Sequence, residues 1–279
     1  MQDLRGRTAV ITGAASGIGF GIAHALGEAG IDLVLADIEA DTLAKAAEEL
    51  SAHGVRTLAV PTDVTDRAAV AALADAAYGA MGRVDVLCSN AGVGAFPPIA
   101  EATGADWDWV VSVNLGGTIN CLLAFLPRMK AQEGDKHIVL TASIAGLAPL
   151  NITIYSTTKY AIVGMGESLA QESATHGYGI GVSILCPGGV LTNFGTSGRN
   201  RPDRAVADLS EPPQTERSRG SDPEGKYAPM DPRELGVIVR QAIIDGDLYV
   251  LPHAHTREFV DARHARLSAA FDKAAALRP

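Results

Sequence analysis

Short runs of β-branched and aliphatic residues alternate along the chain with longer stretches in which apolar residues recur at helical spacing. The short runs predict strands over 8–12, 32–36, 55–61, 84–89, 137–141, 182–186 and 247–251. The longer stretches predict helices that end at Gly30 and near Gly82, and others over 39–53, 104–131, 155–175, 231–245 and 256–277. Strands that alternate with helices in this way form a parallel sheet. We therefore expect an α/β protein in which residues 1–279 form a single domain.

Composition narrows the class of protein. The chain has 279 residues and 47% apolar content, with no repeat and no linker-like segment. Its formal net charge of −9 argues against binding to nucleic acid or to an anionic membrane. We find no signal peptide and no apolar run close to the ~18 residues of a membrane span, so we expect a cytoplasmic protein. Cys88, Cys121 and Cys186 lie in apolar runs without metal-ligand spacing, which indicates reduced packing residues and no metal site.

The first predicted strand leads directly into Gly-Ala-Ala-Ser-Gly-Ile-Gly, residues 13–19, and a helix follows. In such a turn Gly13 allows the tight bend, Gly17 lets the backbone approach a pyrophosphate, and Gly19 allows the helix to pack close to the strand. The N-terminus of the helix then presents free N–H groups to the phosphates. A strand, a glycine-rich turn and a helix in this order predict a dinucleotide site.

Asp37 follows the second strand, about twenty residues after the glycine turn, where a carboxylate accepts hydrogen bonds from the adenosine ribose and repels a 2′-phosphate. Ser16 inside the turn and Ile38 after the acid leave no Arg or Lys at either place to neutralise that phosphate. NAD is therefore the expected cofactor. The alternative for Asp37 is a cap on the following helix.

Three further segments follow predicted strands. Asp63 is interpreted as a helix N-cap, an adenine contact or both. Asn90-Ala91-Gly92 contains small residues that would let the backbone lie against the cofactor. Residues 187–192 form a turn at the carboxyl end of a strand, where ligands bind in open α/β sheets, and Thr192 is placed to bond the nicotinamide carboxamide.

Tyr155 and Lys159 are four residues apart, which on a helix places both side chains on one face. A tyrosine hydroxyl has a pKa of about 10, and a cation one turn away favours the phenolate. Bringing that pKa close to neutrality corresponds to about 4 kcal/mol, which one or two close charges can supply in a partly dry site. Tyr155 is therefore a candidate general acid and base, with Ser143 as the hydrogen-bond partner of the substrate oxygen. Alone, the Tyr-Lys pair would indicate only a contact on a helix surface.

Asn114 is polar, although it lies inside the apolar helix predicted over 104–131, where an Asn usually lowers stability. Two interpretations are open. Either the side chain is a satisfied buried amide, or the residue marks a helix distortion that holds a water for proton relay behind Lys159.

Taken together, these segments resemble the short-chain dehydrogenase/reductase family. The resemblance rests on TGAASGIG (12–19), Asp37, Asp63, SNAG (89–92), Asn114, Ser143, YSTTK (155–159) and PGGVLT (187–192), which occur in the family's order. It implies a Rossmann-type, doubly wound and mostly parallel seven-stranded sheet with helices on both faces, and hydride transfer to or from nicotinamide. Ser89 stands where a first Asn is commoner and Ala142 where a second Ser is frequent, but neither change removes a catalytic group.

By this resemblance Tyr155 exchanges the proton, Ser143 orients the substrate oxygen, Lys159 lowers the pKa of the tyrosine and holds the ribose, and Asn114 completes the proton path. The residues implied to bind NAD are Gly13, Ser16, Gly17, Ile18, Gly19, Asp37, Asp63, Val64, Asn90, Gly92, Tyr155, Lys159, Pro187, Val190 and Thr192. Members are commonly tetrameric, so we expect a homo-oligomer, a tetramer or a dimer.

Part of the chain also resembles a smaller group within the family, the bacterial members that oxidise benzylic alcohols of lignin-derived biaryls. The stretches that carry this resemblance are 17–23, 105–120, 179–187 and 248–259. These stretches are mostly scaffold and indicate kinship more than substrate. The candidate pocket walls are apolar, namely Phe96, Leu147, Leu150 and Phe194. They favour a small hydrophobic secondary alcohol or ketone as substrate.

Two C-terminal regions lie outside these motifs. Residues 193–230 are expected to form a substrate lid, whose arginines are either solvated or bind an acidic substrate. Residues 252–279 form a helical tail in which Phe259, Leu267 and Phe271 share an apolar face. That face would pack on its own domain or on a partner subunit.

The expected activity is reversible, NAD-dependent oxidation of a hydrophobic secondary alcohol to a ketone. The alternative is a non-catalytic NAD-binding sensor or scaffold, since fold alone does not determine function. A pure binding protein has no physical reason to keep Asn114, Ser143, Tyr155 and Lys159 together. Reduction of a conjugated carbon-carbon double bond on the same fold would show a differently spaced Tyr and Lys.

Overall fold

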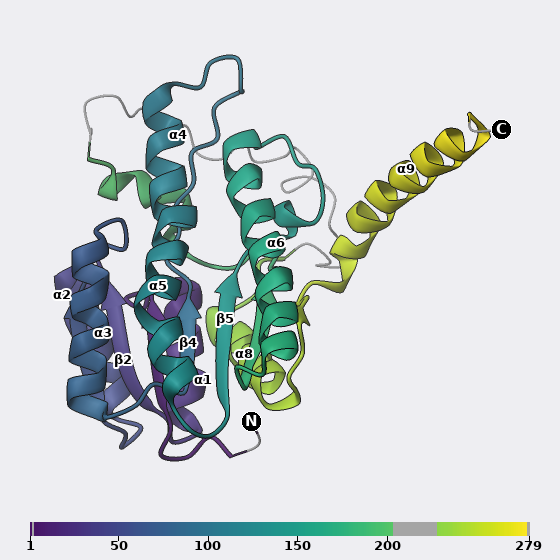
Figure 1. The fold of residues 1–279 in the computed structure, drawn as a ribbon. Coiled ribbons are helices and arrows are strands. Elements are labelled where there is room, and N and C mark those ends of the chain that lie inside the picture. Colours follow the sequence, from purple (N-terminus) through teal and green to yellow (C-terminus); the bar gives the residue numbers. More distant parts are fainter. Residues whose placement is uncertain (2, 203–227, 278–279) are drawn as a thin grey trace.

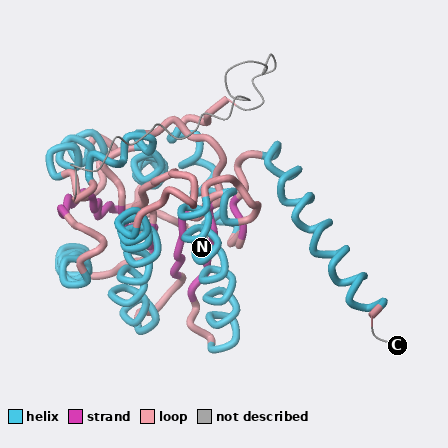
Figure 2. The backbone as a smooth tube through the Cα atoms, turned by 90° about the horizontal axis from the view of Figure 1, so that it is seen from above, coloured by secondary structure: helices cyan, strands magenta, loops and turns pink. Residues whose placement is uncertain are grey.

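The computed structural model describes residue 1, residues 3–202 and residues 228–277. In this part of the chain a single sheet carries helices on both faces (Figures 1 and 2). Its strands are β1 Thr8–Thr12, β2 Asp32–Asp37, β3 Thr57–Pro61, β4 Val86–Ser89, β5 Lys136–Thr141, β6 Ile180–Leu185 and β7 Tyr249–Val250. Their order is β3-β2-β1-β4-β5-β6-β7, and every pairing is parallel. The predicted doubly wound, seven-stranded sheet in one domain is confirmed, with all of its strands parallel.

The helices alternate with the strands as predicted. They are α1 Gly17–Glu28, α2 Ala40–Ser51, α3 Arg67–Met81, α4 Gly104–Val110, α5 Gly117–Ala131, α6 Thr153–His176, α8 Pro232–Asp245 and α9 Arg257–Ala276. Because side chains alternate along a strand, Val10 packs with α3, α5 and α6 on one face of the sheet, while its neighbours Ala9 and Ile11 pack with α1, α2 and α8 on the other. The core therefore consists of two layers, one on each side of the sheet.

Helices α1 and α8 meet through two glycines. A Cβ atom on Gly21 would lie 1.9 Å from the main-chain oxygen of Pro232, and one on Gly236 would lie 2.0 Å from the main-chain oxygen of Gly21. The two backbones are therefore in direct contact. This contact fixes α1, the helix that begins in the glycine-rich turn, against the C-terminal half of the sheet.

The helix predicted over 104–131 is one helical run, but its middle turns, Val111–Gly116, are a π-helix. By length and composition alone, Gly104–Ala131 is apolar and long enough to cross a membrane, and in the described part of the chain it is the one such helix. The prediction that no apolar run approaches that length was therefore wrong. The run packs against α3 and α6, and 44% of its most apolar window is buried.

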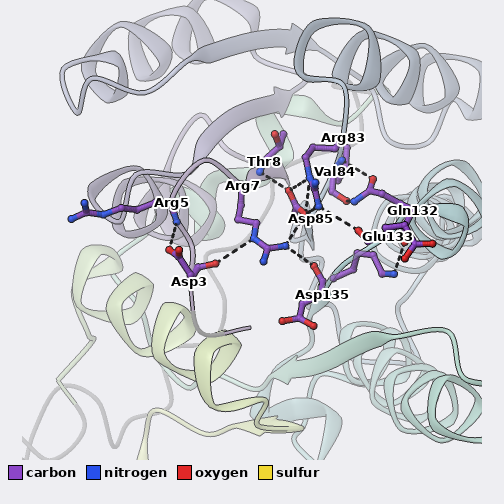
Figure 3. A network of polar contacts seen from close by, with 11 residues as sticks. Asp3, Arg5, Arg7, Thr8, Arg83, Val84, Asp85, Gln132, Glu133 and Asp135 are labelled. Carbon is purple, nitrogen blue, oxygen red and sulfur yellow. Dashed lines mark hydrogen bonds and ion pairs between the residues drawn. The ribbon is translucent and has the colours of Figure 1, made fainter.

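An ionic cluster closes the amino end of the sheet (Figure 3). Asp85, just before β4, is fully buried and accepts hydrogen bonds from the side chains of Arg7 and Arg83 and from the main-chain N–H of Thr8. Gln132 pairs with both main-chain groups of Val84 at 3.1 Å. Strands β1 and β4 and the end of α5 are thus joined at the edge opposite to the one that carries the sequence motifs.

Helix α9 projects away from the rest of the molecule (Figures 1 and 2). None of its residues is buried, and Phe271 is 76% exposed. Only its first turns approach the body, where the guanidinium of Arg263 lies 5.5 Å from the Tyr160 ring centroid. In the described chain, the apolar face predicted for the tail does not pack on its own domain beyond this start.

Candidate active site

One cavity of about 1110 Å³ lies at the carboxyl edge of the sheet. The strand order reverses between β1 and β4, and ligands of doubly wound sheets bind at such a switch point. Of the predicted site residues, the cavity is lined by Gly13, Ser16, Gly17, Ile18, Asp37, Asp63, Val64, Asn90, Gly92, Ser143, Tyr155, Lys159, Pro187, Val190 and Thr192. The predicted walls Phe96, Leu150 and Phe194 line it as well. The fold thus gathers most of the predicted positions around one space.

Three predicted residues do not line the cavity. Gly19 lies behind it, where a Cβ atom would be 2.1 Å from the main-chain oxygen of Gly13. Asn114 is fully buried behind the cavity wall. Leu147 packs against the core beside α6 and is not a pocket wall, because it follows a short 3₁₀ turn that directs its side chain into the protein.

The glycine-rich turn has the backbone expected of a phosphate-binding loop. Gly13 has φ +66° and Gly17 φ +55°, a region that favours glycine. A Cβ atom on Gly17 would lie 2.8 Å from Thr192, so the turn and the segment after β6 face each other closely. Ser16, the N-cap of α1, makes no side-chain capping bond. The first N–H groups of α1 are therefore open to an anion in the cavity.

Asp37 connects the glycine turn to the start of α2. One carboxylate oxygen accepts a hydrogen bond from the main-chain N–H of Ala15 and the other from that of Glu39, each at 3.0 Å. Burial raises the pKa of Asp37, and these backbone bonds oppose the rise. A carboxylate offers about four acceptor sites, so two remain for a ligand. Asp37 does not cap α2, because Glu39 is the N-cap and Asp37 accepts from the N–H of that residue rather than from the first turn of the helix; its role toward a ligand stays a prediction.

A cation that the sequence did not predict pairs with Glu39, two residues after Asp37. Arg199 comes from the segment after β6 and bonds Glu39 through Nε at 2.8 Å, and Asn200 bonds the same oxygen at 2.7 Å. Burial alone would raise the pKa of Glu39, but these two hydrogen bonds outweigh it and the pKa is lowered. The positive charge of Arg199 is thus matched by a carboxylate at the rim of the cavity.

Asp63 does not cap a helix. Its side chain accepts hydrogen bonds from the main chain and hydroxyl of Thr65, whereas Asp66 caps α3 by accepting from Ala68 N at 2.8 Å. The N-cap interpretation was wrong because the turn after β3 is longer than expected. Asp63 still lines the cavity.

Asn90 links the two halves of the sheet at the switch point. Its main-chain N–H donates to the Thr12 hydroxyl at 3.0 Å and its side-chain amide to the Thr12 carbonyl at 3.0 Å. The Thr141 hydroxyl donates to the Asn90 side-chain oxygen at 3.1 Å. The ends of β1, β4 and β5 are therefore held together below the cavity, through an amide that the motif alone did not explain.

Three of the predicted catalytic groups, Ser143, Tyr155 and Lys159, lie together at the floor of the cavity. Ser143 caps a 3₁₀ turn and is 8% exposed, Lys159 is 3% exposed, and the ring of Tyr155 faces the cavity. The Lys159 ammonium donates to the main-chain oxygen of Thr141 at 2.8 Å and lies 5.4 Å from the Tyr155 ring centroid. All three side chains thus converge on one side of the cavity.

Burial controls the ionisation of this group. It raises the pKa of Tyr155 to about 12, although a hydrogen bond with Ser143 opposes the rise, and it lowers the pKa of Lys159 to about 8. The expected lowering of the Tyr155 pKa is not found, because loss of water around the hydroxyl favours the neutral phenol. At neutral pH the tyrosine is therefore protonated, and the lysine is mostly protonated as well.

Both interpretations of Asn114 have a structural counterpart. Its amide is satisfied, since it accepts from Val93 N at 2.8 Å and donates to Val93 O at 3.0 Å and to the Thr158 hydroxyl at 3.1 Å. It also lies in the π-helix Val111–Gly116, so the predicted helix distortion is present. The amide thus fastens the loop after β4 to α6 beside Lys159.

Aromatic side chains form the outer part of the cavity. The rings of Phe96 and Phe194 lie 5.9 Å and 5.3 Å from that of Tyr155, with interplanar angles near 63° in both cases. Phe259, from the first turn of α9, also lines the cavity, which the sequence analysis did not predict. These walls favour an apolar, ring-containing ligand next to the Tyr155 hydroxyl.

His253 was not predicted either, and it contacts the turn after β6 although it does not line the cavity. It is buried, accepts a hydrogen bond from Gly188 N at 3.0 Å and contacts the Gly189 carbonyl at 2.9 Å through its other ring nitrogen. Burial lowers its pKa, so the neutral ring is favoured. The imidazole thus contacts the turn after Pro187 through both of its ring nitrogens and holds that turn in place. Its only sequence signal was its place in the stretch 248–259.

The segment expected to be a lid is described only at its two ends. Its residues 203–227, including Arg204, Arg217 and Arg219, lie outside the described residues. Asn193–Asn200 form 3₁₀ turns over the cavity. In this described part, Arg199 pairs with Glu39 and Arg201 with Asp106, so a carboxylate of the protein already matches the charge of each arginine.

A glycine-rich turn after β1, an acid at the end of β2 and a cavity at the switch point of a parallel sheet are typical of dinucleotide-binding proteins of the doubly wound class. Within that class, the family model for short chain dehydrogenase matches residues 7–203, so the chain belongs to the short-chain dehydrogenase family of oxidoreductases.

Similar proteins span nearly the whole chain. A C alpha-dehydrogenase of Sphingobium sp. is 35% identical over 260 residues, covering 92% of this chain and 84% of the relative. A short-chain dehydrogenase/reductase of Burkholderia phymatum, solved in complex with NAD, superposes with a TM-score of 0.88 at 34% identity over 97% of both chains. LigO of Sphingobium sp. strain SYK-6 gives a TM-score of 0.81 at 36% identity, covering 100% of this chain and 93% of that one.

Proposed function

We propose that the protein is an NAD-dependent dehydrogenase that interconverts a hydrophobic secondary alcohol and its ketone, with Tyr155 as general acid and base. The observation that carries the proposal is the convergence of Ser143, Tyr155 and Lys159 on the cavity that also contains the glycine turn. A hydroxyl, a phenol and a buried ammonium beside a dinucleotide site are the groups that proton-coupled hydride transfer needs.

The residues at the turn fit a dinucleotide. Gly13 and Gly17 leave room where a Cβ atom would otherwise fill the turn, the N-terminus of α1 is uncapped by a side chain, and Asp37 keeps free acceptor sites. NAD bound there would accept the hydride from the alcohol on its nicotinamide ring. Asp37 would hold the adenosine ribose, and Thr192, which faces Gly17, would hold the carboxamide.

In the direction of ketone reduction, Tyr155 donates its proton to the substrate oxygen, which Ser143 orients by a hydrogen bond. A phenol with a raised pKa is protonated at neutral pH and is therefore ready for this direction. Alcohol oxidation needs the phenolate, which Lys159 and a cationic ligand in the same cavity favour. Asn114 bonds Val93 in the loop after β4 and Thr158 on α6, and it thereby holds that loop and helix α6 in place around Lys159.

The preference for NAD over NADP rests on Asp37 and Glu39. A 2′-phosphate would meet two carboxylates, and Arg199, the nearby cation, is already paired with Glu39. An anion in this position would be repelled by Asp37 and would have to displace Glu39 from the arginine.

The substrate class rests on the cavity walls and on the relatives. Phe96, Phe194 and Phe259 surround the space next to Tyr155. One relative is named C alpha-dehydrogenase, which agrees with the benzylic alcohols that the sequence resemblance implies. We extend the proposal to a homo-oligomer, because the apolar residues Leu267 and Phe271 of α9 are exposed. We also propose a cytoplasmic location, because the three cysteines are free thiols in buried positions.

The test is NADH formation by the purified protein with NAD or NADP and a panel of aliphatic, steroidal and benzylic secondary alcohols, repeated with ketones and NADH. Turnover with NAD on an aromatic alcohol supports the proposal. Tight NAD binding in calorimetry without turnover in either direction would favour the alternative, a non-catalytic sensor or scaffold. Light scattering of the same preparation counts the subunits.

A further inference from the structure

Arg201 is a buried arginine at the wall of the active-site cavity. It is 5% exposed, and its Nη1 atom bonds the Asp106 carboxylate at 2.6 Å. Its guanidinium also lies 5.5 Å from the ring centroid of Trp109, which packs in one cluster with Ile154, the residue before Tyr155. Arg201 and Trp109 both line the cavity. The arginine is therefore part of the same chamber as the proposed acid and base.

The second terminal nitrogen of this guanidinium has no partner. In the described part of the chain, four buried side-chain atoms lack a hydrogen bond: Thr8 Oγ1, Tyr78 Oη, Ser156 Oγ and Arg201 Nη2. Only Arg201 among these four residues lines the cavity, and only Arg201 carries a charge. A buried donor left unpaired is unfavourable because it has lost its hydrogen bonds to water, and the cost is larger when the donor is charged. A ligand that accepts from Nη2 would remove this cost.

The charges around Arg201 indicate what kind of acceptor fits. Asp106 already matches its charge: burial raises the pKa of Asp106, but hydrogen bonds from Thr103 and Arg201 outweigh this and lower it. Asp108, on the same helix, also lines the cavity. A substrate carboxylate here would meet one arginine and two acids, so its charge would be uncompensated. An uncharged oxygen would accept the hydrogen bond without that penalty.

We propose that Arg201 is a specificity residue that donates a hydrogen bond from Nη2 to an uncharged oxygen, such as an ether or a carbonyl, on the ring portion of the substrate. This rests on the proposed function and narrows its substrate class to aryl secondary alcohols that carry a neutral oxygen substituent away from the reacting carbon. The Trp109 ring would lie beside the substituted ring, and Asp106 would hold the guanidinium in place.

The experiment compares 1-arylethanols that carry a methyl, a methoxy or a carboxylate group at the meta or para position. A hydrogen bond from a charged donor is worth about ten- to a hundredfold, so wild-type kcat/KM should be higher for one of the methoxy compounds than for its methyl counterpart by about that factor. The carboxylate compounds should be the poorest substrates. Arg201→Met should bring the methoxy and methyl compounds to within about twofold of each other.

Two further variants separate recognition from folding. Arg201→Lys keeps a cation for Asp106 but removes the guanidinium fork, so it should also lose the methoxy preference. Arg199→Lys changes the other arginine that pairs with a carboxylate in this segment and should keep the wild-type ratio. Equal losses for methyl and methoxy compounds in Arg201→Met and Arg201→Lys would show a structural role only and would overturn the proposal. A preference for the carboxylate compound would overturn it too.

Binding keeps this proposal separate from the proposed activity. Calorimetry with the matching aryl ketones in the presence of NAD, which has no hydride to transfer to a ketone, measures the methoxy preference without turnover. If the ketones bind with the expected preference but no alcohol or ketone is turned over, the activity fails and the role of Arg201 stands. If the methyl ketone binds as tightly as both methoxy ketones, the role of Arg201 fails whatever the activity.

Discussion

The ammonium of Lys159 donates a hydrogen bond to the main-chain oxygen of Thr141, 2.8 Å away, at the end of β5. This bond joins the helix that carries Tyr155 to the strand that leads to Ser143. Burial lowers the pKa of Lys159 to about 8, but this value is still above neutral pH, so the lysine is mostly cationic there. The lysine thus holds α6 in register with β5, in addition to its charge effect on the tyrosine.

Removing the phenol should separate chemistry from binding. Tyr155→Phe keeps the ring contacts with Phe96 and Phe194 but has no proton to exchange, so kcat should fall by a factor of about 10² to 10⁴. The affinity for NADH, measured by calorimetry, should stay within about threefold. Tyr160→Phe is the matched control, since Tyr160 follows Lys159 on α6 and does not line the cavity. Normal turnover in Tyr155→Phe would remove Tyr155 from the mechanism.

The cofactor preference should respond to two acids in different ways. Asp37→Ala removes the ribose-facing carboxylate, so NAD should bind about tenfold more weakly and NADP should be excluded less strongly. Adding Glu39→Gln to that variant frees Arg199 from its ion pair, and NADP should then bind more tightly than in the single variant. Titration of both cofactors measures the change. Equal affinity of the wild type for NAD and NADP would contradict the role of Asp37.

The sequence predicted those features whose cause is local. Gly13 and Gly17 have positive φ, the strands are β-branched, and the Tyr155–Lys159 pair is set by helical spacing, so each is visible within a few residues. The parallel sheet followed from the alternation of strands and helices, and the resemblance to the family implied that the sheet is doubly wound. The distortion at Asn114 was also visible, as a polar residue in an apolar helix.

The features that were missed depend on partners far apart in the chain. Arg199 and Glu39 are 160 residues apart, Arg201 and Asp106 are 95 apart, and His253 and Gly188 are 65 apart. No local pattern marks such a pair. The pKa of Tyr155 was misjudged for a related reason, because it depends on how completely the fold removes water from the hydroxyl.

The α1–α8 contact should be sensitive to a single methyl group. In Gly21→Ala the new Cβ atom would lie 1.9 Å from a backbone oxygen of α8, so the two helices must separate. We expect a loss of about 2 kcal/mol or more in unfolding free energy, measured by urea denaturation. Gly164→Ala is the control, because a Cβ atom there meets nothing within 4 Å and Ala favours a helix by up to about 1 kcal/mol. Equal stability of Gly21→Ala and the wild type would mean that the helices are not in direct contact.

His137 should make the fold sensitive to acid. Its Nε2 atom lies 2.8 Å from the Ser183 hydroxyl, which itself donates to the main-chain oxygen of Asp247, so Nε2 carries the hydrogen and Nδ1 is the site that gains a proton. Burial lowers the pKa of His137 from 6.5 to about 4. Above pH 6.5 the ring is neutral in both the folded and the unfolded protein, and the fold is fully stable with respect to this group.

Below that pH the unfolded chain binds a proton that the buried ring resists, so stability is lost progressively as the pH falls from 6.5 towards about 4, by about 3 kcal/mol in total. His137→Gln keeps a donor for Ser183 but cannot be protonated, and its acidic groups are those of the wild type. The difference in urea unfolding free energy between the two proteins should therefore shift in favour of the variant as the pH is lowered through this window. If the difference is the same at pH 7 and pH 4.5, protonation of His137 does not contribute to acid unfolding.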